Sequence, residues 1–214
     1  MPFNCGMSFF LPKICFLNQD ALYCRYLECK NGDDTMNEDF LKLMETRRTC
    51  RNFNSQPVPP DVLDRILRAG TFAATGRNRQ SPVMIAVTEP ELLKQLSRLN
   101  AEIMDSPGID PFYGAGTVII VLADREIPTY LYDGTLVMGN LMLAAHACGV
   151  DSCWVHRAKE EFERTEGKAI LERLGISGSY EGIGHCALGY AAAPLNPASP
   201  RKENYIYRIG PSKH

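Results

Sequence analysis

The amino-acid sequence predicts an α+β domain with a central sheet, flanking helices and one buried helix. Two apolar runs rich in β-branched residues, at 82–88 and 117–123, predict buried strands. Residues 133–149 have the length of a helix but almost no polar side. Helical and strand-like segments alternate irregularly, and no internal repeat is present. These observations together favour one layered domain.

The first 35 residues differ from the rest of the chain. They contain two short apolar patches, at 8–11 and 14–17, with no sustained helical or alternating period. Neither patch has the length or the basic lead-in of a signal peptide. The polar run 30–35 then indicates a boundary. We therefore expect an extension over 1–35, irregular or upstream of the true start, and a domain over 36–214.

The remaining elements follow from hydrophobic periodicity and from proline and glycine. Apolar residues recur at helical spacing in four further segments, 37–47, 61–69, 89–101 and 159–174. Prolines precede the second of these segments, as is typical of a helix start. Further strands are expected over 152–156 and 183–190, and a candidate terminal strand over 205–209 (YIYRI).

The segment 133–149 is the most unusual of the predicted helices. Asp133 is a candidate cap for its start and Gly149 for its end. Between them, apolar residues occupy nearly every side of the helix. Such a helix must be buried all round, either at the centre of the domain or in an oligomer interface.

Composition excludes several classes of function. The 214 residues carry a net charge of −2 and a pI of about 6.1, so no global basic field exists to hold nucleic acid or an anionic membrane. No apolar run approaches the roughly 20 residues needed to span a bilayer. Eight cysteines are present without a Cys-x-x-Cys pair, which gives metal binding little support. They are expected to be reduced, mostly buried thiols of a cytoplasmic protein.

The first candidate site is the cluster Arg47-Arg48-Thr49-Cys50-Arg51. Three guanidinium groups in five residues repel one another unless they are solvated or meet an anion. Arginine forks and a threonine hydroxyl match phosphate oxygens. An exposed basic helix end is the plainer interpretation of the same residues.

Three further segments carry candidate residues. The loop 73–80 (AATGRNRQ) combines small residues with Asn78 and Gln80, which can pair with the edge of a heterocycle. The segment 149–156 holds Trp154, the single tryptophan, and a histidine, both of which are more often structural. Arg201 and Lys202 form a small basic pair that either completes a phosphate site or lies on the surface.

Taken in order, these motifs resemble the nitroreductase family of flavoproteins. The resemblance runs from about Met36 to Lys202 and rests on the order and spacing of seven pieces rather than on any one of them. These are RRTCRNF at 47–53, PVP at 57–59, AATGRNRQSP at 73–82, YGAGTVIIVLAD at 113–124, DGTLVMGNLMLAAHACGVDSCW at 133–154, ALGY at 187–190 and PRK at 200–202.

The resemblance implies a sandwich with a mostly antiparallel central sheet, an intertwined homodimer with FMN at the interface, and helix 133–149 at the dimer core. It implies that FMN is contacted by residues in four places, namely Arg47, Arg48, Thr49 and Arg51; Thr75 and Asn78; Cys153, Trp154 and Val155; and Arg201 with Lys202. The terminal YIYRI run is expected to reach the partner.

The implied activity is hydride transfer from NADH or NADPH through FMN to a small acceptor, such as a nitroaromatic or a quinone, in a ping-pong sequence. No side-chain catalyst and no metal are expected. Two departures from the family pattern, Ala74 for a frequent proline and Ser81-Pro82 for a frequent Pro-Trp, leave the acceptor open. Alternatives are dehalogenation or flavin breakdown on the same fold, a flavin-binding redox module without turnover, and a cysteine-rich metal-binding protein.

Overall fold

The computed structural model describes residues 35–54 and 56–210 of the chain. The chain divides into two compact units, Met1–Leu41 and Lys42–His214, and the sheet with its covering helices belongs to the second. Helix α2 (Thr35–Thr46) contains the junction between them and confirms the helix predicted over 37–47. The extension predicted over 1–35 lies, except for Thr35, outside the described residues, so that boundary stays a prediction. Within the described ranges, no helix is long and apolar enough to cross a membrane.

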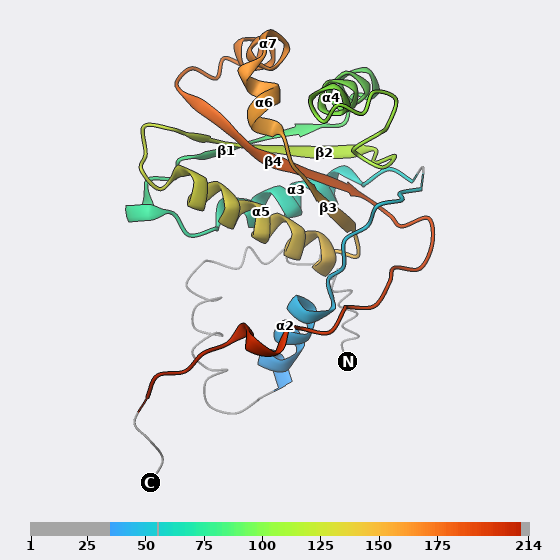
Figure 1. Ribbon diagram of the computed structural model, residues 1–214, viewed down its shortest axis with the longest axis vertical. Coiled ribbons are helices and arrows are strands. Elements are labelled where there is room, and N and C mark those ends of the chain that lie inside the picture. The colour runs from blue at the N-terminus through green and yellow to red at the C-terminus, as the bar shows by residue number, and fades with distance from the viewer. Residues whose placement is uncertain (1–34, 55, 211–214) are drawn as a thin grey trace, which may run out of the picture. The chain divides into compact units, whose positions relative to one another are not determined.

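Four antiparallel strands form one sheet in the order β1-β2-β4-β3 (Figure 1). The strands are β1 (Pro82–Val87), β2 (Thr117–Asp124), β3 (Asp151–Val155) and β4 (Tyr180–Gly189). The fold class and these four strands are as the sequence predicts. The terminal strand predicted over 205–209 is wrong for the single chain. Tyr205 ends the short η3 turn (Glu203–Tyr205), and all of 205–209 is exposed and pairs with none of the described strands.

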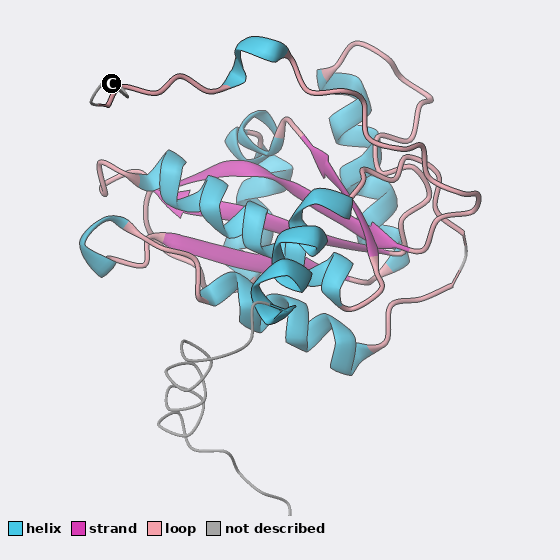
Figure 2. Cartoon of the chain, turned by 90° about the horizontal axis from the view of Figure 1, so that it is seen from below, coloured by secondary structure: helices cyan, strands magenta, loops and turns pink. Residues whose placement is uncertain are grey.

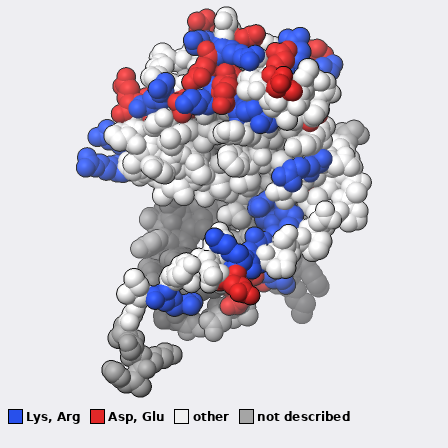
Figure 3. Space-filling view, in the orientation of Figure 1, with Lys and Arg blue, Asp and Glu red and all other residues white. Residues whose placement is uncertain are grey.

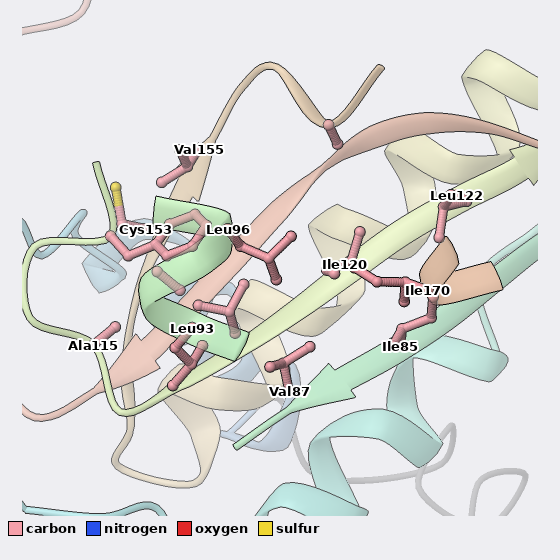
Figure 4. Packing of buried hydrophobic residues seen from close by; sticks show 14 of the residues in the cluster. Ile85, Val87, Leu93, Leu96, Ala115, Ile120, Leu122, Cys153, Val155 and Ile170 are labelled. Atoms are coloured by element: carbon pink, nitrogen blue, oxygen red, sulfur yellow. The ribbon is translucent and has the colours of Figure 1, made fainter. Parts of the chain in front are cut away.

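Helices cover both faces of the sheet, with α4, α6 and α7 on one side and α3 and α5 on the other (Figure 1). Strand β2 is buried on both faces, and its side chains alternate between two cores, as the strand geometry requires. Val118, Ile120 and Leu122 belong to the first core, which α4 (Pro90–Ile103) closes with Leu93 and Leu96. Figure 4 shows Ile120 and Leu122 in this core together with the two leucines of α4.

The opposite face is covered by α3 (Pro60–Thr71) and α5 (Tyr130–Ala147), which lie in front of the strands in Figure 2. Ile119 and Val121 of β2 point into this second core. There they join Ile66 of α3 and Leu141 of α5, both fully buried. The sheet is therefore the middle layer of a three-layer sandwich.

Helix α5 starts three residues before the predicted position, so Asp133 is not its cap. Asp133 lies inside the helix and is buried. Gly149, with φ +72°, follows the helix end in the left-handed conformation typical of a helix stop. The helix is not buried all round within one chain, because Leu131, Tyr132 and Leu136 are exposed. Three large apolar side chains of α5 thus remain exposed.

The helix predicted over 159–174 is two helices, α6 (Ala158–Glu163) and α7 (Thr165–Arg173). The chain is extended at Arg164, with ψ 163°. Gly167 of α7 sits directly against the α6 backbone, where an added Cβ would come within 2.4 Å of the Glu161 carbonyl oxygen. The missing side chain at Gly167 lets α7 pack this closely against α6, and amphipathic periodicity alone does not reveal the break at Arg164.

Candidate functional site

The segment 47–54 leaves α2 and runs along the edge of the sheet beside β3. Thr49 forms a parallel bridge with Ser152, and the Cys50 N–H donates to the Ser152 carbonyl at 3.0 Å. Further on, the Phe53 N–H donates to the Tyr113 carbonyl at 3.0 Å. These backbone contacts bring the predicted arginine cluster and the predicted 153–155 segment together.

We call the segment 47–51 beside β3 the arginine corner. Its three arginines differ in their surroundings. The Nη1 of Arg47 is shielded from solvent and has no hydrogen-bond partner among the described residues. Arg48 folds back, and its guanidinium donates to the Arg47 and Glu45 carbonyls. Thr49 and Arg51 are exposed. A buried cationic donor without an acceptor is costly, so Arg47 is suited to an anion brought by a ligand.

Of the three predicted site residues on β3, only one has an exposed side chain. Trp154 is 53% exposed, while Cys153 and Val155 point into the first core. The Trp154 indole lies over Gly184, where an added Cβ would come within 2.2 Å of Nε1. A ligand on this strand would therefore meet the tryptophan ring and the backbone of its neighbours.

The thiols near this corner are suppressed as nucleophiles. Burial raises the pKa of Cys153, and the charges of Arg51 and Arg47 only partly oppose it. Burial likewise raises the pKa of Cys50. Burial, together with the neighbouring Cys153, raises the pKa of Cys186 to about 12. A thiolate nucleophile is disfavoured at these three positions at neutral pH.

The loop 75–80 is held in an unusual backbone conformation. It contains the turn η2 (Gly76–Asn78), and Arg77, Asn78 and Gln80 all have φ near +50°. Such left-handed values are uncommon for residues other than glycine, so the surroundings must hold the loop. The Gln80 N–H donates to Thr75 Oγ1 at 3.1 Å, which closes the loop on itself.

Asp133, which sequence reasoning took only for a helix cap, anchors this loop. One carboxylate oxygen accepts from the Gly76 N–H at 2.9 Å. The other accepts from Ser81 Oγ at 2.8 Å and from Thr129 Oγ1 at 3.0 Å. The signal in the sequence is a lone carboxylate within an apolar helix. Such a charge, once buried, needs hydrogen-bond donors from elsewhere in the chain.

The arginine corner and the 75–80 loop lie at opposite corners of the sheet. Strand β3 is one edge and β1 the other. Pro82, which follows the loop, pairs with Ala123 at one end of β2, whereas Ser152 aligns through Leu188 with Thr117 at the other end. From strand spacing and rise, about 20–25 Å separate Pro82 and Ser152. One chain therefore does not bring Thr75 and Asn78 to Arg47.

Arg201 and Lys202 are exposed in the chain that leaves β4. Lys202 Nζ lies 5.1 Å from the centre of the Tyr205 ring. Within the described ranges, no hydrogen bond or ion pair joins either residue to the arginine corner. Their predicted phosphate contact stays a prediction.

Two hollows lie near these elements. One of about 500 Å³ lies between α4 and the loop 108–115, lined by residues that include Lys94, Arg98 and Phe112, and it contains no predicted site residue. A smaller one of about 140 Å³ is lined by Thr75 and Gln80 together with Met84 and Val137. Only the smaller hollow adjoins the predicted site.

An antiparallel four-stranded sheet between two helical layers, with an arginine-rich segment on one edge, defines an α+β sandwich with a candidate anion site. Residues 44–190 match the model of the Nitroreductase family, and the chain belongs to that family. An NADH dehydrogenase/NAD(P)H nitroreductase-like protein of Archaeoglobus fulgidus is 30% identical over 158 residues, which cover 72% of this chain and 86% of the relative.

Solved structures agree with this assignment. A nitroreductase with bound FMN from Bacteroides fragilis superimposes with a TM-score of 0.73 at 26% identity, covering 80% of this chain and 98% of the other. An iodotyrosine deiodinase bound to FMN and 3-iodo-L-tyrosine has the same fold, with a TM-score of 0.63 at 17% identity and coverage of 79% and 99%.

Proposed function

We propose that this protein binds FMN and passes hydride from NADH or NADPH to a small acceptor such as a nitroaromatic or a quinone. The observation that carries the proposal is the buried, unpartnered Nη1 of Arg47 at the sheet edge, in a chain of the Nitroreductase family. The four described cysteines are free thiols, in keeping with a cytoplasmic enzyme.

The residues of the arginine corner fit the phosphate of FMN. Arg47 offers a buried donor, and Arg51 and Thr49 are exposed beside it. In our proposal Arg47 and Arg51 hold the phosphate, Arg48 keeps the turn in place through the backbone, and Trp154 borders the ring system. Arg201 and Lys202 add positive charge from the chain end. Bound FMN would supply reversible two-electron chemistry that no described side chain provides.

We propose that the site is completed by a second copy of the chain. Thr75 and Asn78 cannot reach Arg47 within one chain, because they lie at the opposite corner of the sheet. The outer face of α5 supports this, since Leu131, Tyr132 and Leu136 are exposed. Figure 3 shows charged side chains gathered over α4, α6 and α7, while the band over α5 is almost uncharged. A homodimer packed through α5 would cover this face.

A second candidate is reductive dehalogenation on the same scaffold. It is favoured by one observation, the match of 64 residues at 31% identity to an iodotyrosine deiodinase of Nematostella vectensis, which covers 30% of this chain and 24% of that relative. In our proposal, both reactions would use the FMN held at the arginine corner. An acceptor panel containing a nitroaromatic, a quinone and a halogenated phenol separates them.

The test is the spectrum of the purified chain. We expect the absorption bands of oxidised flavin, their loss on anaerobic addition of NADH or NADPH, and their return when a nitroaromatic is added. Arg47→Ala should lose most of its flavin on dialysis, while Arg173→Gln, an exposed change on α7, should keep it. Unchanged flavin content in Arg47→Ala would contradict the assignment of the phosphate. Flavin that does not bleach would favour the binding module without turnover.

A further inference from the structure

We propose that Arg77 and Arg79 select reaction partners that carry a negatively charged group, a carboxylate or a phosphate ester, at the flavin site. This inference rests on the proposed function and names the class of molecule that the site prefers. It is carried by the distribution of charge in the chain and by the anchoring of the 75–80 loop.

Carboxylates are scarce along the segments of the proposed site. Asp151, at the start of β3, is the exception at the arginine corner, and it accepts from the Ala191 N–H at 2.8 Å. No aspartate or glutamate occurs in 46–60, 71–88, 152–159 or 190–202, although the whole chain has 25 acidic residues and a net charge of −2. The positive charge is therefore local. On the α4, α6 and α7 side, by contrast, both signs are interspersed (Figure 3).

Arg77 and Arg79 form no ion pair within the described part of the chain. The ion pairs of the described residues involve α4, α6, β4 and their adjoining loops, and none includes Arg77 or Arg79. Both side chains are exposed. The carboxylate that touches their loop, Asp133, is 2% exposed and already accepts three hydrogen bonds, so it is fully engaged with other donors.

The loop presents these two arginines in a fixed frame. Its ends are tied to Asp133 through the Gly76 N–H and the Ser81 hydroxyl, and the left-handed backbone at Arg77 and Asn78 sets the direction of the chain. A charge on an anchored loop loses less entropy on binding than one on a mobile loop. The pair thus stands next to Thr75 and Asn78, the residues that we place at the flavin.

The two groups of arginines have different roles in the proposed site. In the proposed site, the FMN phosphate is met by Arg47 and Arg51 at one corner, which leaves Arg77 and Arg79 of the other copy unneutralised. The molecule that enters last, whether donor or acceptor, meets that remaining positive charge. A neutral acceptor gains nothing from it, whereas an anionic one does.

The test compares matched reaction partners on the FMN-loaded full chain at low ionic strength. We expect kcat/KM to be about 5–10-fold higher for para-nitrobenzoate than for para-nitrobenzamide, the size expected from two partly solvated charges. The double variant Arg77→Gln, Arg79→Gln should bring the two acceptors within twofold, with unchanged flavin content. The control double variant Lys168→Gln, Arg173→Gln removes two charges from exposed positions on α7 and should keep the preference.

Two further arms locate the anion and separate the two proposals. NADPH and NADH are compared as donors in anaerobic flavin reduction, and an NADPH preference that disappears in the double variant assigns the anion to the extra phosphate of the donor. Titration of the flavin absorbance with benzoate and benzamide measures binding without turnover. Absence of turnover with selective benzoate binding would refute the proposed reaction and support the charge selection. The charge selection would be overturned if each anionic partner and its matched neutral or less charged partner gave equal values. It would also be overturned if the preferences were unchanged in the double variant.

Discussion

Replacing Asp133 with asparagine removes the charged acceptor that holds the 75–80 loop to α5. The Ser81 and Thr129 hydroxyls can rotate and accept hydrogen bonds from the new amide NH2 group. The Gly76 N–H can donate only to the remaining, uncharged carbonyl oxygen. Each buried hydrogen bond to a charged group contributes about 1.5–3 kcal/mol, and the three share one partner, so we expect a loss of about 2–4 kcal/mol. The carboxylate is almost fully buried, which keeps the solvent from replacing it.

The loss is measured as a change in the free energy of unfolding in urea, or as a fall in Tm of about 5–15 °C for a domain of this size. The matched control is Asp64→Asn, an exposed carboxylate on α3, which should change stability by less than about 0.5 kcal/mol. Trypsin cuts after arginine, so a released loop should be cleaved faster at Arg77 and Arg79. A variant with the stability and the cleavage rate of the wild type would refute the anchoring role.

Three other predictions use single positions. Gly182→Ala would place a Cβ within 2.2 Å of the α6 backbone and should lower the free energy of unfolding by more than about 2 kcal/mol, whereas Gly116→Ala, with open space around it, should be near neutral. Urea unfolding compares the two variants, and equal unfolding curves would contradict this packing. Alkylation at pH 8, followed by peptide mass spectrometry, should label half-buried Cys148 well before Cys186, whose pKa is about 12, and the reverse order would be inconsistent with that burial. Fluorescence of Trp154, the single tryptophan, should fall when FMN binds, and no change would place the flavin elsewhere.

Much of the secondary structure was predictable because the local pattern of apolar residues reflects which side chains are buried. The continuous apolar run at 117–123 matches a strand that faces two cores, and the helical spacing in 61–69 matches α3. The predictions failed where distant contacts decide. YIYRI has the composition of a strand but pairs with none of the described strands. The extended backbone at Arg164 divides a predicted helix into two.

The candidate site likewise has features that the sequence predicts and features that only the structure reveals. The arginine cluster stood out in the sequence because its charges are adjacent, and the structure places it beside β3. That Cys153 points inward while Trp154 points outward follows from the pairing of β3 with β4, together with the layer that covers each face. The role of Asp133 was missed because its donors lie 52 and 57 residues away as well as four.

The sequence by itself determined the family, the positions of the main helices and strands, and the residue types available to bind an anion. These properties depend on order and spacing along the chain. Only the tertiary structure decided that Arg47 has a buried donor in need of a partner, that Asp133 anchors a loop, and that the two halves of the predicted site lie at opposite corners of one sheet. Strand order and register bring about these relations, and they arise from long-range pairing that no local pattern encodes.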